Sequence, residues 1–156
     1  MYKDAKRWDN IIEQSLLESV ISNANEAIVW GGNYYALPPC RGFLLWIKVP
    51  PMNTMADAEY AWTSFDFPSK AFTTHRHRDG KRTHPTTKPT TLMSFCIQEC
   101  DRHNSAQTIL DPFMGSGTTL LAAKDLGRKA VGIEIEEKYC EIAANRLSQE
   151  VMDLGV

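Results

Sequence analysis

The sequence predicts an α/β fold with a mixed sheet, and its C-terminal half gives the strongest signal. A short apolar segment at 108–110 leads into a glycine-containing loop, and a helical pattern at 118–126 leads out of it. A second apolar segment at 130–133 follows, which completes a strand–loop–helix–strand unit. Strand-like segments and one helical pattern precede this unit, at 26–30, 42–47, 58–67 and 10–22. Strands and helices mixed in this way are typical of an α/β domain.

Composition places the chain among ordinary globular proteins. It has 156 residues, of which 43% are hydrophobic and 23% are charged, and its formal net charge is -2. This length is enough for one domain with a core. No apolar run approaches the ~20 residues that span a membrane. The four cysteines form no CxxC pair, so we expect free thiols and a cytoplasmic location.

Local signals set the expected element ends. Asn10 followed by Glu13 resembles a capping box for the helix at 10–22. Pro89 is expected to open a helix at its first position, with Leu92, Phe95 and Cys96 on one face. Gly127 is expected to end the helix at 118–126. A last amphipathic helix begins near residue 136.

The loop that follows the segment at 108–110 reads Asp111-Pro-Phe-Met-Gly-Ser-Gly-Thr-Thr119. Its glycines, Gly115 and Gly117, let the backbone turn sharply and let a ligand approach closely. Glu134 ends the second strand of this unit, where a carboxylate suits a ribose diol. The pattern therefore predicts a nucleoside site.

The same loop favours S-adenosylmethionine over other nucleosides. Thr118 follows Gly117 where a P-loop needs lysine, and Leu120 stands where the dinucleotide fingerprint needs its third glycine. Asp111 would not help to bind a pyrophosphate, but it would attract a cationic ligand. S-adenosylmethionine carries a sulfonium and an ammonium group, so the pattern favours it over NAD.

A basic segment lies between residues 70 and 88. It holds six basic residues against one acid, Asp79. We interpret it as a solvated loop that contacts phosphate of a nucleic acid. Two of its three histidines, His75 and His77, are interpreted as polar surface and not as metal ligands. The basic residues are Lys70, Arg76, Arg78, Lys81, Arg82 and Lys88.

Four motifs in order resemble the beta group of DNA amino-methyltransferases. Residues 111–119 are similar to the cofactor motif of that group, and residues 84–89 (His-Pro-Thr-Thr-Lys-Pro) are similar to the motif before it. Val131-Gly-Ile-Glu134, followed by Tyr139 and Ala143-Ala-Asn-Arg146, resembles the acidic ribose motif and its helix. Residues 30–34 and 56–66 resemble the phage-type adenine N6 members. The resemblance covers about residues 8–148.

The resemblance implies a Rossmann-like, three-layer fold with a mixed sheet in a single domain, 1–156. Residues 1–88 would form the target side, 89–148 the cofactor side and 149–156 a tail. The reaction implied is methyl transfer from S-adenosylmethionine to the N6 amino group of adenine in DNA. The DNA contacts implied are Lys70, Arg76, Arg78, Lys81 and Arg82. The cofactor contacts implied are Asp111, Phe113, Gly115, Ser116, Gly117, Thr118, Thr119, Glu134, Ile135, Thr86, Lys88 and Pro89.

One family motif has no counterpart. The Asp-Pro-Pro-Tyr sequence that holds the target base would precede the helix at 10–22, and it is absent from this sequence. Leu37-Pro-Pro-Cys40 lacks both the amide or acid and the aromatic ring, so we interpret it as structural. Asn33 and Tyr34 are the remaining catalytic candidates. We therefore expect a fold incomplete at its N-terminus, with a sheet edge beside residues 26–30 that favours self-association.

Three alternatives stay open at this stage: a non-catalytic cofactor- or DNA-binding module derived from such an enzyme, an N4-cytosine methyltransferase, and an RNA methyltransferase. The basic segment does not separate DNA from RNA. The preference for adenine rests on the phage-type resemblance alone.

Overall fold

The structure, a computed structural model, describes residues 12–51, 56–75, 88–103 and 107–148. These residues form two compact units. The first unit contains the described residues up to His75, together with Arg102 and His103. The second contains residues 88–101 and 107–148. Each unit is described by itself below.

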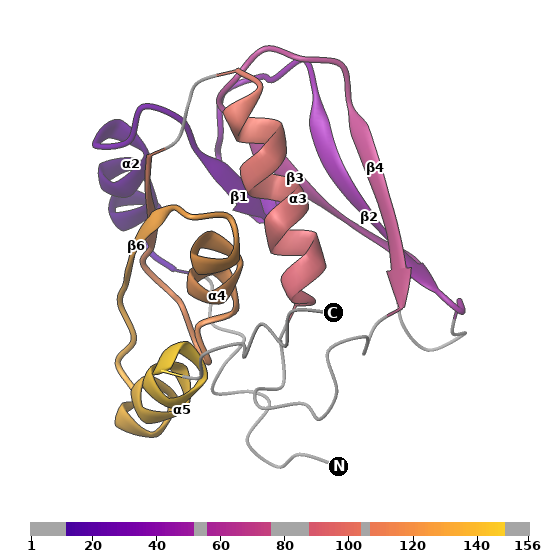
Figure 1. The fold of residues 1–156 in the computed structure, drawn as a ribbon. Helices are drawn as coiled ribbons and strands as arrows, with labels where there is room; N and C mark the ends of the chain where they lie inside the picture. The colour runs from indigo at the N-terminus through magenta and orange to yellow at the C-terminus, as the bar shows by residue number, and fades with distance from the viewer. Residues whose placement is uncertain (1–11, 52–55, 76–87, 104–106, 149–156) are drawn as a thin grey trace. The chain divides into compact units, whose positions relative to one another are not determined.

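The first unit is built on a four-stranded mixed sheet with the strand order β1-β3-β2-β4 (Figure 1). Strand β3 runs antiparallel to both β1 and β2, and β4 runs parallel to β2. Strands β1, β2 and β4 therefore point the same way, and their carboxyl ends lie at the same end of the sheet. The elements are α2 (Gln14–Ser22), β1 (Ile28–Trp30), η1 (Gly32–Tyr34), β2 (Phe43–Val49), β3 (Ala58–Thr63) and β4 (Lys70–His75).

Alternating side chains of β2 face a buried layer. Leu44, Trp46 and Lys48 are buried, whereas Phe43, Leu45, Ile47 and Val49 on the opposite face are more exposed. This alternation is the period expected of a strand with one buried face. The other buried apolar residues of the unit are Leu17, Ala61, Trp62, Phe65 and Phe67. Of the tryptophans in the predicted strands, Trp46 and Trp62 are buried and Trp30 is half-buried.

The predicted strand at 58–67 ends earlier, at Thr63. The buried Thr63 hydroxyl donates a hydrogen bond to the carbonyl oxygen of Gly42, 3.1 Å away. After this point the chain leaves the sheet, but Phe65 and Phe67 still pack together with ring centroids 4.9 Å apart. Their apolar character made the segment look like a longer strand, although they fill the core from outside the sheet.

The first described helix begins four residues later than the predicted start at residue 10. Its N-cap residue is Glu13, which has an extended backbone, and no side chain caps the helix. The predicted capping box of Asn10 and Glu13 is therefore wrong, because Glu13 occupies the cap position itself. Gln14 instead ties the helix to residue 36: its side-chain amide donates to the Ala36 carbonyl and accepts from the Ala36 amide.

The predicted loop at 70–88 is wrong for its first six residues. Lys70–His75 form β4, which pairs along its whole length with β2. Polar residues hid this strand, because only Phe72 and Ala71 among its six are apolar. Two adjacent threonines, Thr73 and Thr74, favour extended backbone. Residues 76–87 lie outside the described part of the chain.

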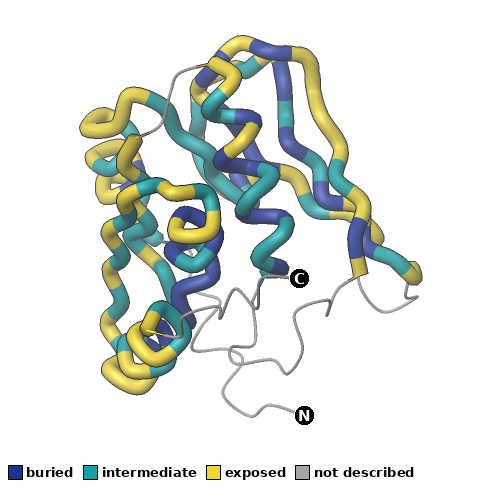
Figure 2. The backbone as a smooth tube through the Cα atoms, viewed as in Figure 1, coloured by how far each residue is buried: buried dark blue, intermediate teal, exposed yellow. Residues whose placement is uncertain are grey.

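The second unit consists of α3 (Thr90–Asp101), β5 (Thr108–Asp111), α4 (Thr118–Asp125), β6 (Lys129–Gly132) and α5 (Glu137–Ser148). Strands β5 and β6 are parallel, with Thr108 opposite Lys129 and Asp111 opposite Gly132. Helix α4 contacts both strands and also α3 and α5. Its buried positions are Thr118, Leu120, Ala122 and Ala123. Figure 2 shows buried backbone positions in dark blue.

Most predicted boundaries in this unit are confirmed. Helix α3 begins directly after Pro89, whose carbonyl oxygen accepts from the amides of Leu92 and Met93. Gly127 follows α4 with a φ of 66°, the left-handed backbone predicted for it. All four cysteines are free thiols. No helix within the described ranges is long and apolar enough to cross a membrane.

Candidate functional site

The glycine loop, residues 112–117, joins β5 to α4 at the carboxyl ends of the two parallel strands. Gly115 and Gly117 have φ values of 52° and 75°, in the left-handed region that favours glycine. Backbone hydrogen bonds hold the loop against β6: the Met114 amide donates to Ile133 O at 3.0 Å, and the Ile133 amide donates to Asp111 O at 2.9 Å. The turn is therefore fixed from both strands.

Glu134 connects the glycine loop to the segment after β6. Its Oε2 accepts from the Gly115 amide at 3.0 Å, and its Oε1 accepts from the Glu136 amide at 2.9 Å. The side chain is half-buried. A carboxylate offers about four lone-pair sites, so these two bonds leave each oxygen able to accept another donor. The predicted ribose acceptor thus lies against the predicted loop.

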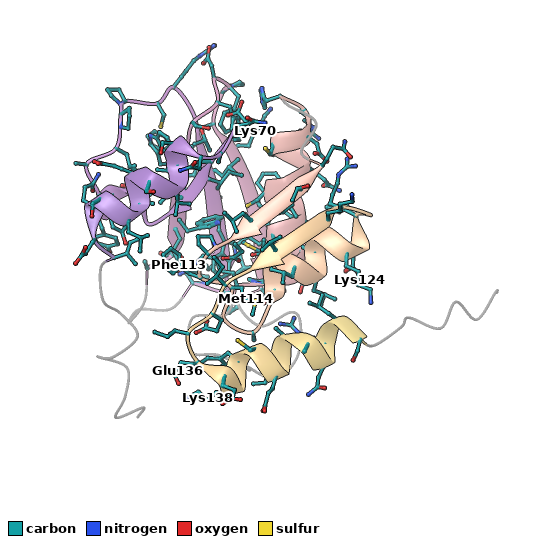
Figure 3. The ribbon with its side chains drawn as sticks, turned by 90° about the vertical axis from the view of Figure 1, so that its left-hand side faces the viewer. Lys70, Phe113, Met114, Lys124, Glu136 and Lys138 are labelled. Atoms are coloured by element: carbon teal, nitrogen blue, oxygen red, sulfur yellow. The ribbon has the colours of Figure 1, made fainter. Side chains whose placement is uncertain are left out.

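Other predicted residues line the same part of the second unit. Asp111 ends β5, and its Oδ1 accepts from the Phe113 amide at 3.1 Å. Phe113 and Ile135 expose 51% and 94% of their surface. Figure 3 shows Phe113 and Met114 in the loop and Glu136 where the chain approaches α5. Exposed apolar side chains of this kind can cover the apolar parts of a ligand.

The first turn of α4 follows the glycine loop. Gly117 is its N-cap residue and provides no side-chain hydrogen bond to the helix. A helix leaves the amides of its first turn without helical partners, so these amides can bind a ligand. Thr118 and Thr119 begin the helix, and Ser116 and Thr118 are both buried. The structure thus brings together all the predicted cofactor contacts between 111 and 119.

Helix α5 supplies two residues that the sequence prediction did not assign to the site. Arg146 Nη1 donates to Ser116 O at 2.7 Å, to Thr118 Oγ1 at 3.2 Å and to Ser116 Oγ at 3.3 Å. A Cβ on Gly117 would lie 2.7 Å from the Cβ of Ala143. The ribose motif and its helix include both residues, but they lie nearly 30 positions from the loop in sequence, so the motif does not show which loop groups they contact.

The remaining cofactor candidates lie before α3. Lys88 is half-buried and Pro89 is buried. Thr86 lies outside the described residues.

The catalytic candidates belong to the first unit. Asn33 and Tyr34 lie in η1, just beyond the carboxyl end of β1, and Tyr34 is 69% exposed. The Leu37-Pro-Pro-Cys40 segment contacts the core, since Pro38 O accepts from the Trp62 indole nitrogen at 2.7 Å. This contact supports the structural interpretation of the segment.

The predicted DNA contacts are only partly described. Lys70 is exposed and begins β4, whereas His75 ends that strand. Five residue steps of about 3.3 Å separate Lys70 from His75 by about 17 Å. Lys70 is therefore at the opposite end of β4 from His75, the residue that the other basic residues of the segment follow in sequence. Arg76, Arg78, Lys81 and Arg82 lie outside the described residues, and so does His77. Within the described ranges, no group of three or more His, Cys, Asp or Glu side chains could hold a metal ion.

Among curated proteins, two that are similar to this chain are Type II methyltransferases. The chain is 42% identical over 74 residues to the Type II methyltransferase M.HinfI of Haemophilus influenzae, which is 47% of this chain and 20% of that protein. It is 47% identical over 66 residues to the Type II methyltransferase M2.LlaDCHI of Lactococcus lactis subsp. cremoris, which is 42% of this chain and 24% of that protein. The matched segment thus spans about a fifth to a quarter of these relatives.

Among solved structures, the M1.HpyAVI–SAM complex matches with a TM-score of 0.56 and 25% sequence identity. That match covers 86% of this chain and 69% of the other. The chain has the mixed α/β, Rossmann-like fold of such methyltransferases. The model of the N6_N4_Mtase family, described as DNA methylase, matches residues 4–145. Because that match takes in both the glycine loop and Glu134, this chain belongs to the DNA methylase family.

Proposed function

We propose that this chain binds S-adenosylmethionine at the glycine loop and forms the cofactor-binding part of a DNA methyltransferase that acts on the N6 amino group of adenine. Its membership of the DNA methylase family supports this function. Two curated relatives carry the name Type II methyltransferase, and a solved relative was crystallised with SAM. Adenine as the target base rests on the phage-type motifs in the sequence.

The hydrogen bonds of Glu134 are the observation that carries the cofactor proposal. The Gly115 and Glu136 amides orient the carboxylate, and each of its oxygens keeps capacity for one more bond. A ribose diol has two adjacent hydroxyl donors, which match these two oxygens. Hydrogen bonds to a charged acceptor are the strong ones. The carboxylate is thus oriented before any ligand arrives, which lowers the entropy lost on binding.

The other residues of the site suit the rest of this cofactor. Asp111 contributes a negative charge at the end of β5, which favours a ligand with cationic groups. Phe113 and Ile135 offer exposed apolar surface for an adenine ring. Glycine at 115 and 117 permits the left-handed backbone that forms this turn. When bound, S-adenosylmethionine would supply an electrophilic methyl group.

Equilibrium dialysis with methyl-labelled S-adenosylmethionine tests the cofactor class. We expect saturable binding that unlabelled S-adenosylhomocysteine displaces, because both ligands carry the adenosine. NAD and ATP at the same concentration should displace little label, since Asp111 disfavours their phosphates. Displacement by NAD as effective as that by S-adenosylhomocysteine would move the site to the dinucleotide class.

Methyl transfer itself is expected to be slow for this chain. The sequence contains no Asp-Pro-Pro-Tyr motif to hold the target amino group. Each 1.36 kcal/mol of lost transition-state stabilisation lowers the rate about tenfold. The measurement is transfer of labelled methyl groups to adenine-rich duplex DNA, followed by digestion to nucleosides. Fast turnover would make Asn33 and Tyr34 the first residues to mutate, and label in N4-methylcytosine would contradict adenine as the target.

A non-catalytic role in binding cofactor or DNA is the second candidate, and the same absent motif favours it.

Strand β1 is at one edge of the four-stranded sheet and pairs with β3. An open strand edge can pair with another chain, so self-association stays a prediction.

A further inference from the structure

The glycine loop and the start of α4 are held by contacts on two sides. On one side, Glu134 accepts from the Gly115 amide. On the other side, Arg146 of α5 donates to Ser116 and Thr118. Gly117 lies between these two groups of contacts, against Ala143 of the same helix. Residues 115–118 are thus each held by a contact from outside the loop.

The Arg146 contacts act on buried polar groups. Ser116 and Thr118 expose only 3% and 7% of their surface. Arg146 Nη1 reaches one carbonyl oxygen and two hydroxyl oxygens there, at distances from 2.7 to 3.3 Å. A buried polar group that loses a partner is destabilised unless the backbone shifts. Arg146 therefore selects one conformation of the turn between β5 and α4.

The electrostatics of Arg146 give it no clear advantage for stability alone. Its charge is in the last turn of α5, where a cation is favourable, but it also lies at the first turn of α4, where a cation is unfavourable. These two effects oppose each other. Hydrogen bonding to the loop is thus the distinctive contribution of this residue.

We propose that Arg146 is a positioning residue for the cofactor: it acts through Ser116 and Thr118 to keep the glycine loop in its binding conformation. This inference rests on the proposed function of the loop. Arg146 does not itself need to touch the ligand. A loop that is fixed beforehand loses less conformational entropy on binding, so the loss of Arg146 should lower ligand affinity.

Lys124 provides a matched control. Its Nζ donates to Leu147 O at 2.6 Å, so it also joins α4 to α5 through a cation and a carbonyl oxygen. It lies six residues beyond Thr118, about 9 Å further along the helix. Figure 3 shows Lys124 well away from Phe113. A variant at Lys124 removes one tether between the helices and leaves the loop contacts in place.

The experiment compares R146M, R146K and K124M with the unchanged chain. Calorimetry measures S-adenosylhomocysteine affinity, and amide hydrogen exchange without ligand measures protection of residues 115–121. For R146M we expect at least tenfold weaker binding and at least tenfold faster exchange in that segment. R146K, which keeps a donor and the charge, should recover part of both losses. K124M should change the affinity less than twofold, with faster exchange only near residues 124 and 147.

Equal affinity and equal loop exchange in R146M and K124M would overturn the positioning role. If the unchanged chain binds no S-adenosylhomocysteine, the proposed function fails, and the exchange data still test whether Arg146 fixes the loop. If R146M does not fold, T118V removes one of the three acceptors. A T118V variant with unchanged loop exchange, together with R146K unchanged in affinity and exchange, would also contradict the inference.

Discussion

Single residues decide whether the backbone can form the turn before α4. Gly117 combines a φ of 75° with a close approach to Ala143, whose Cβ would be 2.7 Å from a Cβ at residue 117. Gly127 has a similar φ of 66°, but a Cβ there would meet nothing within 4 Å. A larger residue at position 117 is therefore opposed by both backbone conformation and packing, whereas at position 127 it is opposed by backbone conformation alone.

We expect G117A to lower the free energy of unfolding by about 2–4 kcal/mol, because left-handed backbone and overpacking both disfavour it. G127A should lower it by about 1–2 kcal/mol, from the backbone alone. Urea denaturation monitored by circular dichroism measures both. A143G should relieve the contact, so the G117A/A143G pair is expected to be less destabilised than the sum of the single variants. Additive effects would show that Ala143 does not limit the loop.

A second close approach joins the start of β2 to the end of the segment after β3. A Cβ on Gly42 would lie 2.1 Å from the Phe67 carbonyl oxygen and 3.0 Å from its carbonyl carbon. Backbone atoms cannot rotate away, so G42A should lower the free energy of unfolding by about 3 kcal/mol. G132A is the comparison, since its Cβ would meet movable side-chain atoms of Met114 and Leu120. Equal losses in thermal denaturation would contradict this explanation.

At the scale of elements, local periodicity and turn chemistry predicted most of what was found. Strands β1, β2, β5 and β6 and helices α3, α4 and α5 were all predicted within a few residues. Strand β4 was missed because its stability comes from pairing with β2, while its own composition is polar. The predicted capping box before α2 is wrong because the chain uses Glu13 as the N-cap residue.

The sequence likewise predicted only part of the candidate site. The glycine loop and Glu134 follow from residue type and order along the chain. The family motif includes Arg146 and Ala143, but their contacts with the loop do not follow from it, because these contacts arise only when α5 packs against α4. Sequence reasoning finds groups that are close along the chain or belong to a known pattern. It does not find a contact made by a helix about 30 residues away.

The basic segment carries the proposed contacts with DNA phosphate. Neutralising Arg76, Arg78, Lys81 and Arg82 together should flatten the dependence of log affinity on log salt by up to about 3.6 units, since each phosphate contact contributes about 0.9. Filter binding to duplex DNA between low and moderate salt measures this slope. A variant that neutralises Arg41, Lys129 and Lys138 elsewhere should change it by less than about 1. An unchanged slope in the first variant would move the DNA face away from this segment.

For the whole molecule, the central claim is that the parallel strands β5 and β6 end in a cofactor site. The glycine loop, Glu134 and helix α5 all belong to the second unit. The four hydrogen bonds that join Glu134 and Arg146 to residues 115, 116 and 118 make that unit the part to test.

Calorimetric titration of S-adenosylhomocysteine into the 156-residue chain and its E134A variant tests this claim most directly. Loss of the charged acceptor should weaken binding by about 1.5–3 kcal/mol, which is roughly tenfold to more than a hundredfold. The control is E141A, which removes an exposed carboxylate from α5 and should bind as the unchanged chain does. Saturable binding that E134A weakens and E141A preserves is the predicted result. Equal affinity of the unchanged chain and E134A would contradict the account.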